Sequence, residues 1–145
     1  MAVGLVTGYG YFVTLALRFL YPRNGSSRRW QFLATLSDFP SGTQREFRSP
    51  VGHRVLVTRI SDAADASSFL ALSDVCPHLG CRVHWEPQNN RFFCPCHNGV
   101  FDPSGKATAG PPADAGQSLF RYPIRVEGEL VLIEVPVEDV RGRTA

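Results

Sequence analysis

The chain opens on an uninterrupted apolar stretch. Residues 1–17 carry no charged side chain, and the stretch continues past Arg18 to Tyr21. A helix of about 20 such residues, rising about 1.5 Å per residue, just crosses a hydrocarbon layer of roughly 30 Å. We therefore expect residues 1–21 to form a transmembrane anchor, with Arg18 reaching toward the headgroups and Tyr21 at the membrane interface.

A secretory signal peptide and a buried core helix are the alternatives for this stretch. No basic segment precedes the apolar residues and no small-residue cleavage pattern follows them, which favours an uncleaved anchor. Several arginines gather at its carboxyl end: Arg18, Arg23, Arg28 and Arg29. By the positive-inside rule, these charges would keep the following domain on the cytoplasmic side.

The rest of the chain alternates in the manner of short strands. Pro22 ends the helical pattern, and residues 22–29 form a polar link containing glycine and serine. Segments rich in β-branched and aromatic residues then alternate with Pro, Gly, Ser and Asp, which is typical of antiparallel sheets. The expected strands cover residues 30–36, 43–48, 54–60, 68–72, 82–87, 91–94, 119–126 and 129–135. Hairpin turns are expected at residues 88–90 and at Glu127 and Gly128, and no amphipathic helix after the anchor.

Length and composition bound this picture. A chain of 145 residues has room for one compact domain. A content of 43% hydrophobic and 19% charged residues is ordinary for a folded domain, and a net charge of +2 is too weak to indicate nucleic-acid binding. The fold class is therefore all-β: an antiparallel β domain over residues 30–137 on one N-terminal transmembrane helix, with residues 138–145 as a C-terminal tail.

All four cysteines and two histidines crowd into one short window, which indicates a metal site or disulfides. They form two segments: Cys76-Pro-His78-Leu-Gly-Cys81 and Cys94-Pro-Cys96-His97. A structural zinc site is one alternative, but zinc ribbons favour two similar Cys-x-x-Cys knuckles, and the spacings here are Cys-x4-Cys and Cys-x-Cys. An adventitious cluster of disulfides is the other.

The pattern Cys-x-His, fifteen residues, then Cys-x-x-His resembles the Rieske [2Fe-2S] family, and the resemblance covers roughly residues 30–137. It implies a Rieske-type fold with a small cluster-binding subdomain over about residues 74–113. It also implies one [2Fe-2S] cluster as the cofactor, with two cysteines on one iron and two histidines on the other. The implied metal ligands are Cys76, His78, Cys94 and His97.

The resemblance extends to the residues around the ligands. In Rieske proteins of the quinol-oxidising cytochrome bc type, a pair corresponding to Cys81 and Cys96 forms a disulfide between the cluster loops, whereas oxygenases and soluble ferredoxins usually lack it. Leu79 matches a position that shields the cluster and faces the quinone pocket. Gly110-Pro111-Pro112 resembles the proline loop that covers the cluster from the other side. A buried leucine and an ordinary turn are the plain alternatives. His53 and His84 are interpreted as ordinary strand residues.

The implied function is electron transfer from quinol. Neutral imidazoles in place of two thiolates make the centre less negative and easier to reduce. His78 and His97 would be the catalytic residues, because exposed imidazoles gain proton affinity when an electron arrives. The second loop continues as Asn98-Gly99-Val100-Phe101, where many high-potential members have Gly-Ser-x-Tyr. Without the two hydroxyls, we expect a low potential suited to menaquinol.

The family implies partners that complete this chemistry: a cytochrome b subunit with haem, a c-type cytochrome, quinol and the membrane, and no nucleic acid. A one-electron centre cannot finish a two-electron oxidation, so the chain is expected to be a subunit of a quinol:cytochrome c oxidoreductase and not a complete enzyme. The disulfide favours an extracytoplasmic, periplasmic head despite the arginines. A twin-arginine leader upstream of this sequence would resolve that conflict. The remaining alternatives are the small subunit of an arsenite-oxidase-like enzyme and a soluble ferredoxin-like carrier.

Overall fold

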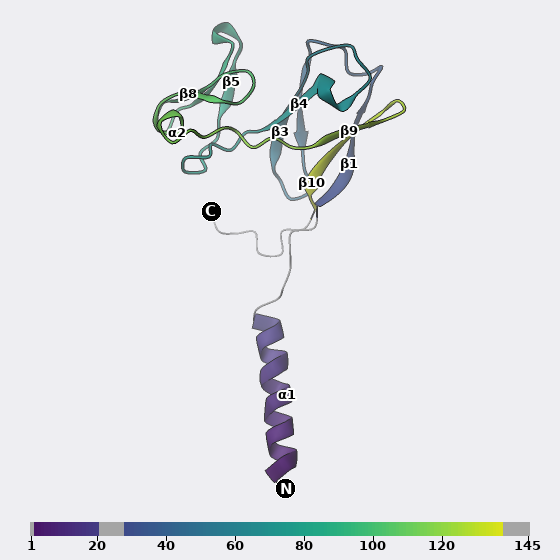
Figure 1. Ribbon diagram of the computed structural model, residues 1–145, viewed down its shortest axis with the longest axis vertical. Coiled ribbons are helices and arrows are strands. Elements are labelled where there is room, and N and C mark those ends of the chain that lie inside the picture. The colour runs from purple at the N-terminus through teal and green to yellow at the C-terminus, as the bar shows by residue number, and fades with distance from the viewer. Residues whose placement is uncertain (1, 21–27, 138–145) are drawn as a thin grey trace.

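The structure is a computed structural model that describes residues 2–20 and 28–137. Its first element is the helix α1 (Ala2–Leu20), which is long and apolar enough to span a membrane (Figure 1). No part of its apolar window is buried by the rest of the protein, as is expected of a helix that meets lipid. The expected link over residues 22–29 and the tail over 138–145 lie wholly or mostly outside the described residues.

The described residues after α1 form short antiparallel strands with three brief helical segments. The elements, in chain order, are β1 (Arg28–Thr35), β2 (Gln44–Arg48), β3 (Arg54–Arg59), η1 (Ala66–Ser68), β4 (Phe69–Ser73), β5 (His84–Glu86), η2 (Pro87–Asn89), β6 (Arg91–Cys94), β7 (Gly99–Phe101), β8 (Ala107–Ala109), α2 (Pro111–Asp114), β9 (Ile124–Glu127) and β10 (Leu130–Pro136). The all-β fold expected from the sequence is confirmed.

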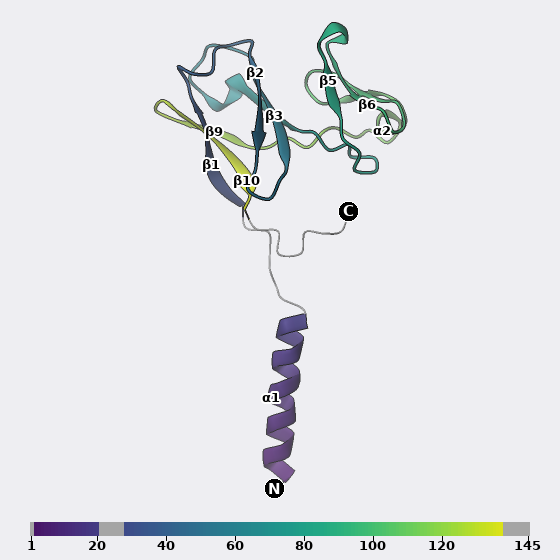
Figure 2. The same cartoon turned by 180° about the vertical axis from the view of Figure 1, so that it is seen from behind.

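These strands build three sheets in two neighbouring units. The first two sheets have the orders β1-β10-β9 and β2-β3-β4, and together they form the base of the head. The third sheet, β5-β6-β7-β8, lies beside the base with α2 (Figures 1 and 2). The chain crosses from the base after β4 and returns to it before β9, so the smaller unit is an insertion into the base.

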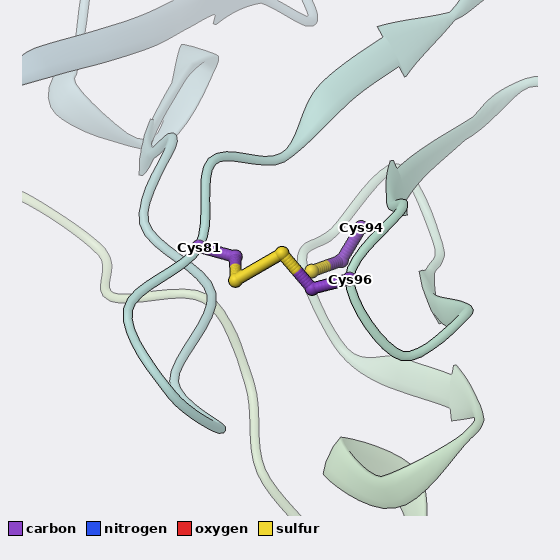
Figure 3. Close-up of side chains that lie close together, drawn as sticks. All are labelled: Cys81, Cys94 and Cys96. Atoms are coloured by element: carbon purple, nitrogen blue, oxygen red, sulfur yellow. A yellow bond between two sulfur atoms is a disulfide. The ribbon is translucent and has the colours of Figure 1, made fainter.

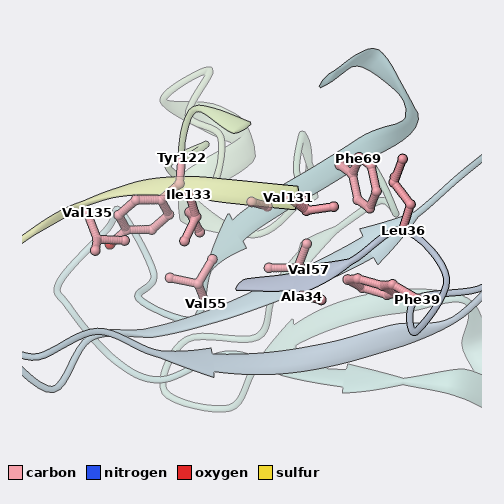
Figure 4. Packing of buried hydrophobic residues seen from close by; sticks show 11 residues of the cluster. Ala34, Leu36, Phe39, Val55, Val57, Phe69, Tyr122, Val131, Ile133 and Val135 are labelled. Carbon is pink, nitrogen blue, oxygen red and sulfur yellow. The ribbon is translucent and has the colours of Figure 1, made fainter. Parts of the chain in front are cut away.

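The core of the base lies between its two sheets. Alternate residues of β3 and β10 point inward, as the twofold period of a strand requires, and Val55, Val57, Val131 and Ile133 are fully buried (Figure 4). Aromatic rings from the strand ends and loops, those of Phe39, Phe69 and Tyr122, complete the cluster. The members are Ala34, Leu36, Phe39, Val55, Val57, Phe69, Ala71, Tyr122, Val131, Ile133 and Val135.

One inward position of β3 is an arginine. Arg59 is buried, and its guanidinium group donates hydrogen bonds to four backbone carbonyls, with donor-to-acceptor distances of 2.7–3.1 Å. The acceptors are Leu36, Phe39, Ser61 and Asp62. The same group lies over the Phe69 ring, 5.5 Å from its centroid. Arg59 therefore holds together the two loops that close this end of the core.

The smaller unit has a core of its own. Leu72, Val83, Phe92, Phe101 and Leu119 are buried together, and two cysteines, Cys76 and Cys94, belong to the same cluster. Because these two cysteines pack in the core, the core fixes the backbone of the two cysteine-containing segments. A rigid metal site requires such tightly packed support.

The structure differs from the sequence expectation in three segments. The strand expected over residues 119–126 is formed only as β9, and the preceding residues make single bridges such as Leu72 with Arg121. Pro123 lacks a backbone N–H and cannot continue a ladder on both edges. The strands β7 and β8 were not anticipated, because three residues are too few to display an alternating pattern.

Candidate metal centre

Two loops of the smaller unit carry the cysteines and histidines of the sequence motif. We call residues 76–81 loop 1 and residues 94–99 loop 2. Loop 1 closes on itself, because the Cys76 N–H donates to the Cys81 carbonyl (2.7 Å) and the Gly80 N–H donates to the Cys76 carbonyl (3.0 Å). Loop 2 is a tight connection between β6 and β7, whose ends pair at Cys94 and Gly99. Each loop therefore presents its side chains from a fixed backbone.

The two thiols outside the disulfide are buried and lie near each other. Cys76 and Cys94 are 3% and 2% exposed, and both are free. Burial raises the pKa of the Cys76 thiol, and the neighbouring Cys94 raises it further, while N–H groups of His78 and Leu79 act in the opposite direction. Two adjacent thiols in a dry pocket are costly as thiolates unless a cation binds them. Their chemistry therefore fits a positive metal centre.

The two histidines of the motif meet at the outer side of the same site. The ring centroids of His78 and His97 lie 4.9 Å apart, with the rings nearly perpendicular at 88°. His97 is exposed and His78 is half-buried, in contrast to the buried cysteines. The donor set is thus sorted, with sulfur toward the core and nitrogen toward solvent. Two thiols and two imidazoles are the donors that a Rieske-type [2Fe-2S] cluster uses, so the residues present fit that cofactor.

A disulfide between Cys81 and Cys96 joins loop 1 to loop 2 (Figure 3). The Cα atoms of the pair are 6.6 Å apart, and fifteen positions separate them in the chain. The Cys94 sulfur lies within 4.8 Å of both disulfide sulfurs. This grouping of three cysteines is not a three-thiolate metal site, because two of its sulfurs are bonded to each other. It places the covalent link between the loops beside one of the free thiols.

The proline segment packs against loop 2. Gly110 precedes α2 with φ of 76°, and a side chain there would approach the Asn98 carbonyl oxygen to 2.8 Å. Pro112 is buried, and its ring lies over Gly99. The segment that sequence comparison suggested as a cover is therefore a short helix in contact with loop 2. Leu79, by contrast, is 69% exposed at the tip of loop 1.

The remaining histidines make other contacts: His84 lies in β5 as expected of a strand residue, whereas His53 lies just before β3 and not in a strand. His53 lies 3.4 Å from the Tyr122 hydroxyl, and His84 lies 3.5 Å from Glu86. At the two positions where high-potential members carry hydroxyls, Gly99 is a buried glycine at the end of loop 2, and Phe101 is fully buried in the core of the smaller unit. Neither offers a hydroxyl to the site.

Three residues near loop 1 were not found by sequence analysis. Asp74 is a buried carboxylate bound by two arginines, one of them Arg82. The Gln117 side-chain amide nitrogen lies 3.4 Å from the carbonyl of Pro77, between two motif residues. In the sequence, the only sign of an ion pair here was a charged residue on each side of loop 1, Asp74 and Arg82. The contacts with Arg54 and Gln117 join segments that are distant in the sequence.

Gly110→Ala is predicted to destabilise the head by about 3 kcal/mol, because the new Cβ is forced into a positive φ and against backbone. Gly116→Ala is the matched control, since its φ is +62° but nothing lies within 4 Å of the new atom. It is expected to cost about 1 kcal/mol. Urea unfolding of both variants measures the difference. Equal losses would contradict the close packing of Gly110 on loop 2.

The chain is similar to a known protein family and to curated proteins. The family described as the Rieske [2Fe-2S] domain matches residues 29–128. The iron-sulfur subunit of the cytochrome b6-f complex from Chlorobaculum thiosulfatiphilum is 31% identical over 97 residues, which is 67% of this chain and 49% of that protein. The chain thus spans about half the length of the curated relatives it matches.

Solved structures resemble the head as well. The plasma membrane Rieske protein PetC3 from Synechocystis PCC 6803 is 28% identical with a TM-score of 0.54, over 72% of this chain and 99% of that one. A chain of a hyperthermophilic respiratory Complex III is also 28% identical, with a TM-score of 0.50 over 90% of this chain and 94% of that one. The second match is long enough to extend beyond the antiparallel head.

Proposed function

The chain belongs to the Rieske [2Fe-2S] domain family, and from this membership we propose that it is the membrane-anchored electron carrier of a quinol:cytochrome c oxidoreductase. The observation that carries the proposal is the sorted donor set on two disulfide-linked loops, with buried thiols and outward imidazoles. The disulfide separates this chain from the soluble ferredoxins and oxygenases of the family, which usually lack it. The apolar helix α1 supports membrane anchoring.

We assign the ligands residue by residue. Cys76 and Cys94 would bind one iron, and His78 and His97 the other. The [2Fe-2S] cluster supplies reversible one-electron chemistry when bound. The protein supplies its enclosure, since the core of the smaller unit covers the sulfur side and the disulfide prevents the loops from separating.

The histidine side is the proposed site of exchange with quinol. His97 is exposed and Leu79 stands beside His78 in loop 1 with most of its surface free. An imidazole nitrogen facing solvent can accept a hydrogen bond from a quinol hydroxyl, and then its proton, because added negative charge nearby raises the proton affinity of the ring. The exposed Leu79 side chain offers apolar contact to the quinol ring. Electron and proton would then leave the quinol at the same place.

Quinol releases two electrons, and each needs an acceptor: one for the electron that passes through the proposed centre, and another for the second electron. We propose a c-type cytochrome as the first and a haem of a cytochrome b subunit as the second. The support is that relatives are named as subunits of the cytochrome b6-f complex and that a structural neighbour belongs to a respiratory Complex III. Purification from membranes tests this. Copurifying b-type haem is expected, and copurifying molybdenum would instead indicate an arsenite-oxidase-like assembly.

The proposed side of the membrane follows from the disulfide. Cys81 and Cys96 are bonded, and such bonds persist in oxidising compartments. We therefore propose that the head lies on the extracytoplasmic, periplasmic side. Labelling of an exposed residue by an impermeant reagent in intact cells or spheroplasts tests the orientation.

A redox titration followed by low-temperature EPR is predicted to give a rhombic Rieske-type signal with a potential below about +250 mV. The physical reason is that Gly99 and Phe101, at the positions of the serine and the tyrosine, provide no hydroxyl to hydrogen-bond the sulfurs, and such bonds stabilise the more negative reduced state. A low value fits oxidation of menaquinol. A value above about +250 mV, near the top of the Rieske range, would contradict the menaquinol proposal while leaving the carrier function intact.

A further inference from the structure

A buried carboxylate lies at the neck of loop 1 between two arginines. Asp74 stands two residues before Cys76, and its side chain is only 5% exposed. The Arg54 Nε donates to its Oδ2 at 3.0 Å, and the Arg82 Nη1 donates to the same oxygen at 2.6 Å and also contacts Oδ1. A buried acid at this position needs such partners, since an unpaired buried charge is strongly unfavourable.

The backbone makes this cluster the closure of loop 1. The Val83 N–H donates to the Asp74 carbonyl at 2.7 Å, Val75 and Arg82 form an antiparallel bridge, and the Cys76 N–H donates to Cys81. The two chain segments that enter and leave loop 1 are thus paired like a short ladder. The ion pair between Asp74 and Arg82 spans the same two segments through their side chains.

The carboxylate also ties the neck to the base of the head. Arg54 begins β3, and its carbonyl accepts the Asp74 N–H at 3.3 Å. Arg54 lies 4.0 Å from Glu46 on β2, and Glu46 in turn pairs with Arg48 at 2.9 Å. A row of linked ion pairs therefore runs from the base sheet β2-β3-β4 to the two residues that flank loop 1. It ends at Arg82, the residue that follows the disulfide-bonded Cys81.

The charges of these linked ion pairs do not cancel. Three arginines, Arg48, Arg54 and Arg82, face two carboxylates, Glu46 and Asp74, so the sum is one positive unit. The arginine nearest loop 1 in sequence is half-exposed, while its carboxylate partner is buried. A positive group beside a redox centre stabilises the state with the extra electron, and its effect weakens as salt screens it.

We propose that Asp74 and Arg82 are positioning residues of the metal centre: together they lock the neck of loop 1 against β3 and hold a positive charge beside the cluster-binding loop, which raises the reduction potential. This inference rests on the ligand assignment proposed for loops 1 and 2. Nothing in the ligand motif requires either residue. Their role follows from the contacts of the folded chain.

The test compares three variants of the full chain in mild detergent. Arg82→Gln removes the positive charge and is expected to shift the potential to more negative values. Arg82→Lys keeps the charge but cannot span both carboxylate oxygens, so the potential should stay near the wild-type value while the thermal midpoint falls. Asp74→Asn leaves both guanidinium groups unneutralised and should shift the potential in the positive direction. The shifts should shrink at high salt.

Arg125→Gln is the matched control. The Arg125 side chain is 51% exposed, as that of Arg82 is, but it pairs with an exposed carboxylate, Glu127, on β9 in the base sheet, so its loss should not move the potential. An unchanged potential in Arg82→Gln, or equal shifts in Arg82→Gln and Arg82→Lys, would overturn the inference. If Asp74→Asn does not fold, the two Arg82 variants still decide. Absence of iron and acid-labile sulfide from the wild-type chain would instead refute the ligand assignment.

Discussion

Replacing Cys94 with serine is expected to abolish the iron-sulfur centre. Cys94 is buried at the end of β6 and no other free thiol except Cys76 lies in the described residues, so no neighbouring sulfur can substitute for it. Losing a partner that only supports a ligand costs about 10- to 100-fold in metal affinity. Loss of the ligand itself should exceed that. Iron and acid-labile sulfide analysis, visible absorption and EPR of the purified chain measure the result.

Cys96→Ser is the control that separates a ligand from a structural cysteine. This change breaks the link to Cys81 but leaves the four proposed ligands in place. The centre should assemble and should be lost more readily on warming, because a loop of about 15 residues is no longer closed, at a cost of roughly 3 kcal/mol. If Cys94→Ser retained the centre and Cys96→Ser lost it, the sulfur assignment would be wrong. A colourless wild-type chain containing zinc would also refute it.

Replacing Arg59 with leucine is predicted to destabilise the head by about 4 kcal/mol. The buried carbonyls of Leu36 and Phe39 would lose their donor, and each buried acceptor left without a partner costs about 1–3 kcal/mol. The leucine cannot compensate, since it also lacks the contact of the guanidinium group with the Phe69 ring. For a domain whose total stability is about 5–15 kcal/mol, this is a large fraction. Urea unfolding followed by tryptophan fluorescence measures it.

Arg48→Leu provides the comparison for this loss. The Arg48 side chain is 71% exposed and forms one pair with Glu46, so its replacement should change the free energy of unfolding by about 0.5 kcal/mol or less. Arg59→Lys should fall between the two, because it retains the charge but has fewer donors and no planar group. Similar effects of Arg59→Leu and Arg48→Leu would contradict the structural role of the buried arginine.

The sequence predicted structure best where metal-binding residues are close together along the chain or where a hydrophobic pattern is long. The apolar helix was recognisable because its length matches a bilayer, and the strands of the base were recognisable because residues such as Val55 and Val57 alternate with polar ones. The ligand motif is local within each loop, so spacing alone revealed it. The family assignment and the cofactor that followed from it are confirmed.

What escaped the sequence depends on contacts between distant segments. Asp74 and Arg54 are 20 residues apart, and only the pairing of β3 with β4 brings them together. Arg59 appeared as one more alternating residue of a strand, although its partners lie in loops on either side of it. The proline segment could be placed opposite the ligands only by resemblance, since its contact with Asn98 depends on how β7 and β8 pair.

The small number of residues between anchor and head affects how strongly the head must bind a docking surface near its anchor. Helix α1 ends at Leu20 and β1 begins at Arg28, so eight residue steps, spanning at most about 28 Å, separate them. A tether of that length keeps the head at an effective concentration in the millimolar range around its anchor. A surface that binds it with a dissociation constant of about 1 mM, or about −4 kcal/mol, is then substantially occupied. Such weak docking also permits rapid release, which would suit the electron carrier proposed above.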